Sequence, residues 1–226
     1  MTFVLVHGAW HGSWSWDRVT PLLTAAGARV VCPDLTLDQD VGLAEHVGEL
    51  VAAIDAIADH DLVLVGHSYS GLVVRQAADQ RPGRVAHIVL VDGWAGRDGA
   101  SMAGLAPDWF MASVRAAAGT GWQIPAPAPG LFGITDPADA QWLGQRLCGH
   151  PLRTFVEPTH LTGAVDRIPG TGIHCRPATF PFARLAADIG YRLVAVDGPH
   201  DVLLTHPHDM ADILLSIKKQ EVLSLE

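Results

Sequence analysis

The chain alternates between short apolar runs and longer segments in which apolar residues recur at helical spacing. The apolar runs have the length of buried strands and fall at 2–6, 28–33, 61–66, 85–92, 171–176 and 191–196. The segments between them predict helices at 16–26, 41–58, 70–81, 178–189 and 207–217. Strands that alternate with helices predict an α/β fold, with a doubly wound sheet of about six mostly parallel strands and helices on both faces.

One segment, about 94–165, breaks this alternation. It is rich in Ala, Gly and Pro and carries four tryptophans, Trp94, Trp109, Trp122 and Trp142. A loosely packed surface excursion is one interpretation. Tryptophan rings are seldom left in water, so we expect instead a packed insertion. The whole chain, 1–226, is then one domain with a core of 1–93 and 166–226.

The strongest chemical signal is Gly-His-Ser-Tyr-Ser-Gly at 66–71, which follows the apolar run 62–65 and leads into the helix predicted from residue 70. A strand, a sharp turn with serine at its apex and a helix are the parts of a nucleophile elbow. Such a turn exposes the Ser68 hydroxyl at a helix N-terminus, which favours developing negative charge. The usual pattern is G-x-S-x-G. Here Ser70 takes the last position, and we interpret this small residue as a tolerated variant. A Ser-rich turn without chemistry is the alternative.

Two further segments add to this signal. The first predicted strand runs into His-Gly-Ala-Trp at 7–10, and the last is followed by Asp-Gly-Pro-His at 197–200. With an oxyanion loop, a serine elbow and a late histidine in this order, the chain resembles the α/β-hydrolase superfamily over nearly its whole length. The stretches 7–14, 66–69 and 198–201 are more narrowly similar to the branch that holds plant methylesterases, hydroxynitrile lyases and small bacterial esterases.

The resemblance implies roles for several residues. His200 is the expected base, chosen among twelve histidines; the position of His7 more often supports loop structure, and elbow geometry should point His67 away. The backbone amides of Ala9 and Tyr69 are the expected oxyanion hole. In the family the insertion is a cap over the active site. The candidate substrate-binding residues are Trp10, beside the oxyanion loop, and Trp94, Trp109 and Trp122 of the insertion.

The acid that would orient His200 is less obvious. Relatives in the plant branch carry Asp shortly after the strand that corresponds to 171–176, but the loop 176–182 has no carboxylate. Asp92 ends the strand next to the elbow strand, and catalytic groups collect at the carboxyl ends of parallel strands. Some α/β-hydrolases place their acid there, so we choose Asp92. Alternatives are that Asp92 only caps a turn, or that no acid is present. Asp201 would have to fold back on its neighbour, and Asp34 suits a turn.

We therefore expect a cofactor-independent serine hydrolase of a small or medium carboxylic ester; a lactone or thioester would use the same groups. Hydroxynitrile lyases of this branch rely on a threonine and a lysine at positions that are Gly8 and Asp201 here. Epoxide hydrolases and dehalogenases need an aspartate in place of Ser68. A cofactor-free dioxygenase or cyclase and a non-catalytic receptor on the same fold stay open.

Composition and charge narrow the partners. Of 226 residues, 49% are hydrophobic and 17% charged, which is typical of a globular protein. A net charge of −9 opposes binding to nucleic acid or anionic membranes, and no apolar run reaches the ~20 residues of a membrane span. A strand from residue 2 leaves no room for a signal peptide, so we expect a cytoplasmic protein.

Neither a metal nor a disulfide framework is expected. The three cysteines are scattered, and His206 and His208 flank Pro207 without acidic or thiol residues at ligand spacing. The expected partner is a small ester-like molecule, and a homodimer is left open.

Overall fold

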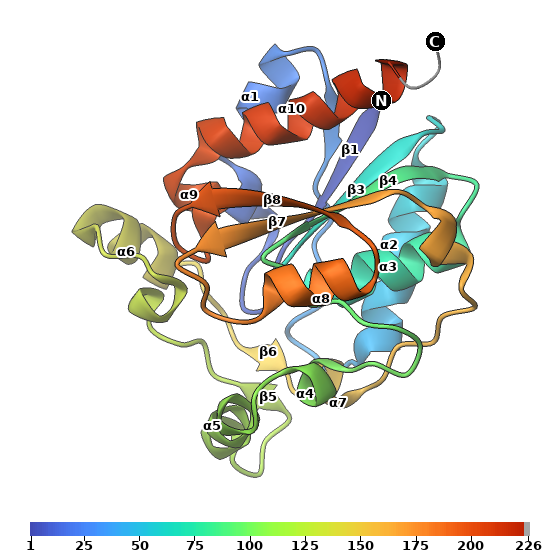
Figure 1. Ribbon diagram of the computed structural model, residues 1–226. Helices are drawn as coiled ribbons and strands as arrows, with labels where there is room; N and C mark the ends of the chain where they lie inside the picture. The colour runs from blue at the N-terminus through green and yellow to red at the C-terminus, as the bar shows by residue number, and fades with distance from the viewer. Residues whose placement is uncertain (224–226) are drawn as a thin grey trace.

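A computed structural model describes residues 1–223, with side chains up to residue 217. Its centre is one sheet in the order β2-β1-β3-β4-β7-β8, in which every neighbouring pair is parallel (Figure 1). The strands are β1 (Thr2–Val6), β2 (Arg29–Val31), β3 (Leu62–His67), β4 (Val85–Val91), β7 (Gly170–Arg176) and β8 (Arg192–Asp197). The predicted sheet of six parallel strands is confirmed. Only β2 is clearly shorter than the run 28–33 that predicted it.

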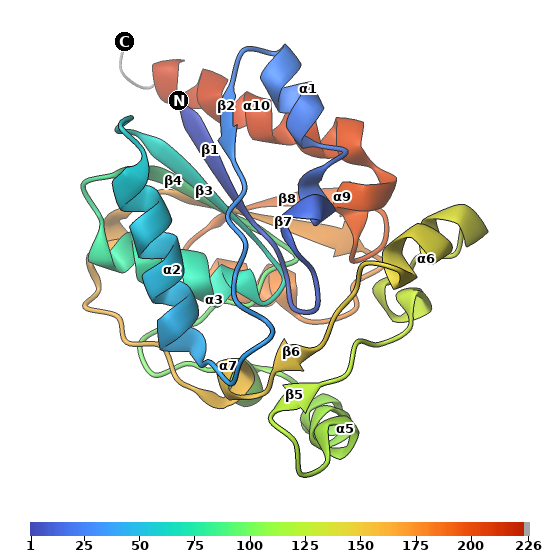
Figure 2. The ribbon, with the colours of Figure 1, turned by 180° about the vertical axis from the view of Figure 1, so that it is seen from behind.

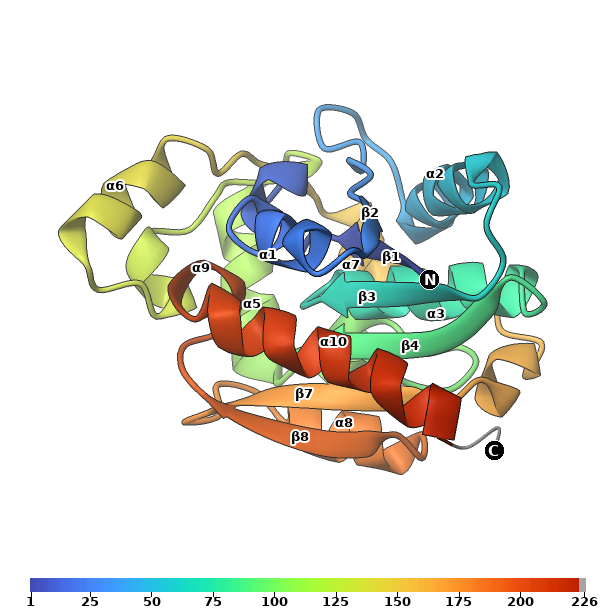
Figure 3. The same cartoon turned by 90° about the horizontal axis from the view of Figure 1, so that it is seen from above.

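Helices cover both faces of the sheet (Figure 3). One face carries α1 (Thr20–Ala25), α9 (Val202–Thr205) and α10 (Pro207–Leu223). The other carries α2 (Leu43–Ala56), α3 (Ser70–Gln80) and α8 (Phe182–Asp188). Side chains of a strand point alternately to the two faces of the sheet. In β1, Phe3 and Leu5 therefore pack in the core under α1, α9 and α10, and Val4 and Val6 pack in the core under α2, α3 and α8. Strands buried on both faces explain why the apolar runs are continuous.

Three predicted helices differ in their limits. The segment 16–26 forms a 3₁₀ helix η1 (Ser13–Trp16) and the separate helix α1, which has a proline in its first turn. The segment 178–189 becomes helical only at Phe182, after Pro181. The last helix runs on to Leu223, beyond the predicted end at 217.

The insertion 94–165 is built from short elements, and Figure 2 shows α5 and α6 standing away from the sheet. Its elements are α4 (Met102–Leu105), α5 (Asp108–Ala118), β5 (Gln123–Ile124), the 3₁₀ helix η2 (Pro129–Phe132), α6 (Pro137–Gly144), β6 (His150–Pro151), α7 (Arg153–Val156) and, at its end, the 3₁₀ helix η3 (Ala164–Arg167). β5 and β6 pair antiparallel. Sequence patterns did not predict these elements, most of which have two or four residues; α5 was missed although it is as long as α3.

The tryptophans of the insertion differ in burial. Trp94 is buried and Trp142 is half-buried, but Trp109 is 63% exposed and Trp122 38% exposed. The expectation that these rings are shielded from water is therefore wrong for Trp109 and Trp122. Trp109 stacks on Phe180, with ring centroids 5.9 Å apart, and meets Phe110 edge to face at 6.0 Å, yet most of its surface stays exposed. The role of this segment as a cap stays a prediction.

Among residues 1–223, no helix has both the length and the apolar character needed to cross a lipid bilayer.

Candidate active site

Ser68 stands at the turn between β3 and α3, and three small residues let the turn close. A Cβ on Gly66 would lie 2.8 Å from the carbonyl oxygen of Ser70, and one on Gly71 would lie 2.3 Å from that of Trp94. Glycine is therefore required at 66 and 71. Ser70 fits in place of the usual glycine, because its Oγ lies 2.9 Å from the carbonyl oxygens of both Val6 and His67 and its polarity is satisfied.

Ser68, His200 and Asp92 form a continuous line of hydrogen bonds. His200 Nε2 lies 3.0 Å from Ser68 Oγ, and His200 Nδ1 lies 3.0 Å from Asp92 Oδ2. Because a carboxylate only accepts hydrogen bonds, His200 Nδ1 carries a hydrogen and donates a hydrogen bond to Asp92. Nε2 is then left with a lone pair that accepts the Ser68 hydroxyl. This is the protonation pattern of a histidine placed to remove a proton from serine.

Asp92 is held from two sides at the end of β4. Its backbone amide donates to Ile173 (2.8 Å), and its Oδ1 accepts the amide of Cys175 (2.8 Å). Both partners belong to β7. The loop after β7 has no carboxylate of its own. Instead, the backbone amide of Cys175 in β7 fixes the carboxylate of Asp92, which follows the neighbouring strand β4.

His200 is fixed by residues on both sides. His67 Nε2 donates to the carbonyl oxygen of His200 (3.0 Å), and the ring of Phe182 lies parallel to the imidazole at 5.4 Å. Gly133, from the insertion, approaches so closely that a Cβ there would lie 2.5 Å from Pro199. We expected His67 to point away from the site. Its ring instead lies 4.8 Å from that of His200, because the His200 loop folds back over the elbow.

The loop after β1 lies directly against the serine. A Cβ on Gly8 would be 3.1 Å from Ser68 Cβ. The carbonyl oxygen of Gly8 accepts His7 Nδ1 (2.9 Å) and the amide of His11 (3.3 Å). In a planar trans peptide the amide of Ala9 points the opposite way from that carbonyl. Tyr69, the other expected oxyanion donor, precedes the first turn of α3.

The four candidate substrate-binding tryptophans separate into two groups. Trp10 is buried, and its indole donates to the carbonyl oxygen of Ile124 (3.2 Å). Trp94 is buried against Phe182, the ring that lies on His200 (centroids 5.0 Å apart). Trp109 and Trp122 are exposed, and Trp109 stacks on Phe180.

Sequence reasoning missed a second histidine–aspartate pair beside the site. His11 Nε2 lies 3.1 Å from Asp201 Oδ2, and both side chains are buried. Asp201 thus faces His11 and not the ring of His200. Asp34 binds the backbone and hydroxyl of Ser13, which fits its expected place in a turn. The sequence contains no spacing signal for the His11–Asp201 pair, since the partners lie 190 positions apart.

The described residues include no group of three or more His, Cys, Asp or Glu side chains that could hold a metal ion.

Comparisons with known proteins found esterases and α/β-hydrolases. The chain is 29% identical over 245 residues to the "Carbendazim hydrolyzing esterase" of Nocardioides sp. (strain SG-4G), an alignment that covers 95% of this chain and 98% of that protein. It is 39% identical over 99 residues to "Methylesterase 2" of Arabidopsis thaliana, covering 39% of this chain and 38% of the other. The structure of an extracellular α/β-hydrolase from a Paenibacillus species superposes with a TM-score of 0.87 at 25% identity and covers 96% of this chain and 98% of that one. Residues 3–213 match the family described as "Alpha/beta hydrolase family". The chain belongs to the α/β-hydrolase family.

Proposed function

We propose that this protein is a serine esterase that cleaves a small or medium carboxylic ester through an acyl-enzyme. Ser68 is the nucleophile, His200 the general base and Asp92 the acid that orients His200. The observation that carries the proposal is the line from Ser68 Oγ through both nitrogens of His200 to Asp92, with 3.0 Å at each step. Esterase names among the relatives support the reaction class.

The reaction follows from the protonation states. As Ser68 Oγ bonds to the ester carbonyl carbon, its proton passes to His200 Nε2. The tetrahedral intermediate then expels the alcohol, which takes that proton as its bond to carbon breaks. Water repeats the two steps on the acyl-enzyme: its proton passes to Nε2, the carboxylic acid is released and Ser68 regains its hydrogen. Throughout, Asp92 stabilises the imidazolium that forms on His200.

Negative charge collects on the former carbonyl oxygen during both steps. We assign the amides of Ala9 and Tyr69 to bind it. The fixed Gly8 carbonyl supports the first assignment, and the position of Tyr69 at the start of α3 supports the second, since a helix N-terminus favours an anion. Trp10 and Trp94 are the candidate tryptophans that we keep for the walls of the acyl pocket.

The test is turnover of aryl esters of graded acyl length beside thioesters and lactones, together with labelling by a fluorophosphonate. We expect ester turnover and a label on Ser68. Replacement of Ser68 by Ala should abolish both, because it removes the nucleophile. Ser216→Ala is the control, since that serine lies on α10 and its Oγ donates to its own helix. A label on Ser70, or activity that survives Ser68→Ala, would contradict the assignment.

A further inference from the structure

His11 makes two hydrogen bonds that a neutral imidazole cannot make together while Asp201 is ionised. Its Nδ1 lies 2.8 Å from the carbonyl oxygen of Ala9, and its Nε2 lies 3.1 Å from Asp201 Oδ2. A carbonyl oxygen and a carboxylate oxygen both only accept. Beside an ionised Asp201, both ring nitrogens of His11 must therefore donate, and only the imidazolium carries a proton on each. The arrangement thus fits a cationic His11, although only 2% of this residue is exposed.

Around the imidazole of His11, the one negative charge in this buried pair is the carboxylate of Asp201, and the positive charge is on His11 itself. Asp201 is 1% exposed and is the anion. Three other histidines interact with His11: His67, whose ring lies 6.1 Å away, His7 and His150. Burial lowers the pKa of His67 to about 3, that of His7 to about 4 and that of His150 well below its usual value, so all three are neutral. Trp14 stacks on one side of His11 at 5.3 Å, and Phe132 meets it edge-on at 5.0 Å. Apolar walls strengthen the attraction between the two charges.

The pKa values follow from this arrangement. Burial by itself would lower the pKa of His11, but the charge of Asp201 and its hydrogen bond outweigh burial and raise that pKa above 6.5. Burial by itself would raise the pKa of Asp201, and the charge of and hydrogen bond from His11 lower it instead. Each partner keeps the other ionised.

The pair joins the two loops that the reaction needs. Asp201 directly follows His200, and His11 holds the carbonyl oxygen of Ala9. At the other end of that same peptide group, the amide of Trp10 lies 3.4 Å from His150 Nδ1. With the Gly8 carbonyl already held by His7, both peptide groups that flank Ala9 are fixed. The amide of Ala9 cannot turn unless one of these hydrogen bonds breaks.

We propose that His11 and Asp201 form a buried imidazolium–carboxylate pair that positions the amide of Ala9 against the Ser68–His200 line, and that full activity requires the pair to be ionised. This inference rests on the proposed esterase function. Both are positioning residues, because they act through Ala9 and through the loop of His200 and do not touch the ester.

The pair predicts the shape of the pH–rate profile. His11 must be protonated to bind Ala9 and Asp201 at once. A neutral ring keeps one proton, which the Asp201 carboxylate draws to Nε2, so the hydrogen bond to Ala9 is lost and activity falls at high pH. Replacing Asp201 by Asn keeps the shape of the side chain but removes the charge that raises the pKa of His11. The falling limb should then move to lower pH.

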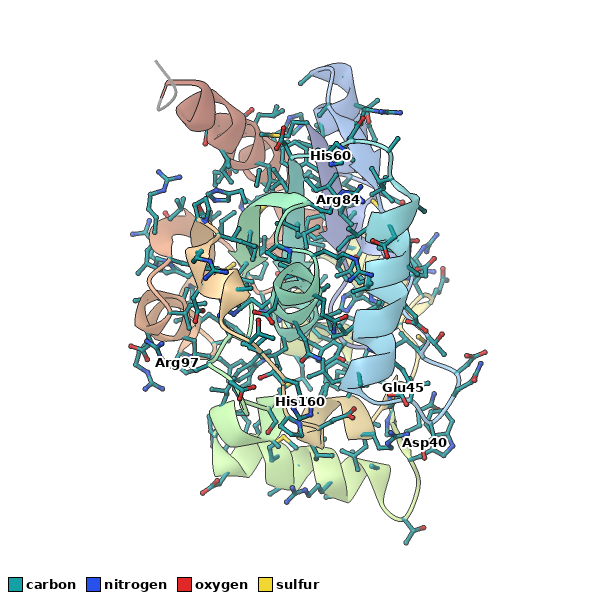
Figure 4. The ribbon with its side chains drawn as sticks, turned by 90° about the vertical axis from the view of Figure 1, so that its right-hand side faces the viewer. Asp40, Glu45, His60, Arg84, Arg97 and His160 are labelled. Atoms are coloured by element: carbon teal, nitrogen blue, oxygen red, sulfur yellow. The ribbon has the colours of Figure 1, made fainter. Side chains whose placement is uncertain are left out.

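The kinetic experiment compares kcat and KM for an aryl ester between pH 5 and 9.5 in the wild type, His11→Gln, Asp201→Asn and His60→Gln. His60 is an exposed histidine ahead of β3, at the opposite end of that strand from Ser68, and serves as the matched control (Figure 4). Misplacing one oxyanion donor should cost His11→Gln about 10–100-fold in kcat, with KM changed less. For Asp201→Asn we expect the falling limb to shift by at least about one pH unit. Wild-type kcat in His11→Gln, or an unmoved limb in Asp201→Asn, would overturn the inference.

A second measurement needs no variant to be active. In ¹⁵N-histidine-labelled wild type, the NMR signals of His11 should show protons on both ring nitrogens at pH 5.5, because the pKa of His11 is raised above 6.5. A single protonated nitrogen there would overturn the ionised pair even if His11→Gln fails to fold. Ester turnover by the wild type with unchanged kcat in His11→Gln would remove this inference and leave the esterase proposal standing. A wild type without turnover or label on Ser68 would contradict the esterase proposal, and the NMR result would then test the pair by itself.

Discussion

Three residues at the site adopt backbone angles that amino acids with a side chain rarely take. The φ angles are 65° at Trp10, 53° at Ser68 and 41° at Asp92. Such conformations cost roughly 1–3 kcal/mol each and persist only where the surroundings fix them. Here the amide of Ser68 donates to Val91, and its carbonyl oxygen accepts the amide of Trp94. These conformations lower the stability of the fold, and they fix the directions of Trp10 in the oxyanion loop, of the proposed nucleophile Ser68 and of the proposed acid Asp92.

Replacing Asp92 by Asn tests the acid at the scale of one residue. The amide cannot accept from His200 Nδ1 and Cys175 with the same strength as a carboxylate, and it favours the wrong tautomer of His200. We expect kcat to fall on the order of 10²–10⁴. The variant should still melt cooperatively near the wild-type temperature, which separates lost chemistry from lost folding. Near-normal turnover in the folded variant would mean that another group, or none, orients His200.

Site residues that lie in a local sequence motif or at the end of a predicted strand could be predicted. Residues that depend on a partner far away in the sequence could not. Ser68 and His200 lie in motifs, and Asp92 could be chosen because it ends a strand next to the elbow strand. The His11–Asp201 pair joins the first loop to the last. Such partners come together only in the folded chain. The residues next to His11 and Asp201 in the sequence do not indicate that either side chain is buried and charged.

At the scale of elements, the site depends on how closely α3 approaches the segment after β4. The first turn of α3 packs on the backbone of Trp94, whose carbonyl oxygen would lie 2.3 Å from a Cβ on Gly71. The amide of Trp94 donates in turn to Ser68. Packing of α3 against Trp94 thus explains why the motif has glycine at position 71. The spacing of apolar residues in strands and helices does not predict this contact.

Replacing Gly71 by Ala should therefore destabilise the protein by about 1–3 kcal/mol, because the backbone of Trp94 would have to move. The matched control is Gly48→Ala in α2, where a Cβ would meet nothing within 4 Å. That change should stabilise the protein by about 0.5–1 kcal/mol, since alanine favours a helix over glycine. Urea unfolding of both variants measures the difference. Equal stabilities would show that α3 can shift away from Trp94 without cost.

The elements themselves were predicted as far as their periods extended. The helix at 41–58 was found within two residues at each end as α2, because five apolar residues repeat on its buried face. The insertion was not resolved into elements, since most of its helices have four residues and its two strands have two residues each. The helix α5, with eleven residues, was missed although its apolar residues recur at helical spacing.

At the scale of the whole molecule, the insertion and the core meet through the site. Gly133 packs on Pro199, and the amide of Asp201 donates to the carbonyl oxygen of Phe132 (3.3 Å). At the surface, Arg18 near α1 binds Asp139 of α6. The loop of His200 is therefore in contact with the β1 loop, through His11, and with the insertion. Because Asp201 lies at this junction, its ionisation affects the stability of the whole fold as well as the reaction.

This coupling predicts how stability depends on pH. The pKa of His11 is raised in the folded state, so its contribution is complete below the unfolded value of about 6.5 and is lost as pH rises through the raised value. The pKa of Asp201 is lowered, so its contribution is complete above about 3.9 and is lost as pH falls through the lowered value. The pair therefore stabilises the fold most between about pH 4 and pH 6.5.

The variant Asp201→Asn should consequently unfold more easily than the wild type, and by an amount that depends on pH. Leaving one buried charge unpaired costs about 3–5 kcal/mol, and His11 can avoid part of that cost by losing its proton, so we expect about 3 kcal/mol near pH 5.5. The difference should shrink as pH rises past the raised pKa of His11, because the wild type loses the ionised pair as well. Urea unfolding from pH 4 to pH 9 measures it. Asp139→Asn, which breaks the partly exposed pair with Arg18, is the control and should cost under about 1 kcal/mol at every pH. A difference for Asp201→Asn that is flat across this range would mean that His11 and Asp201 meet as neutral groups.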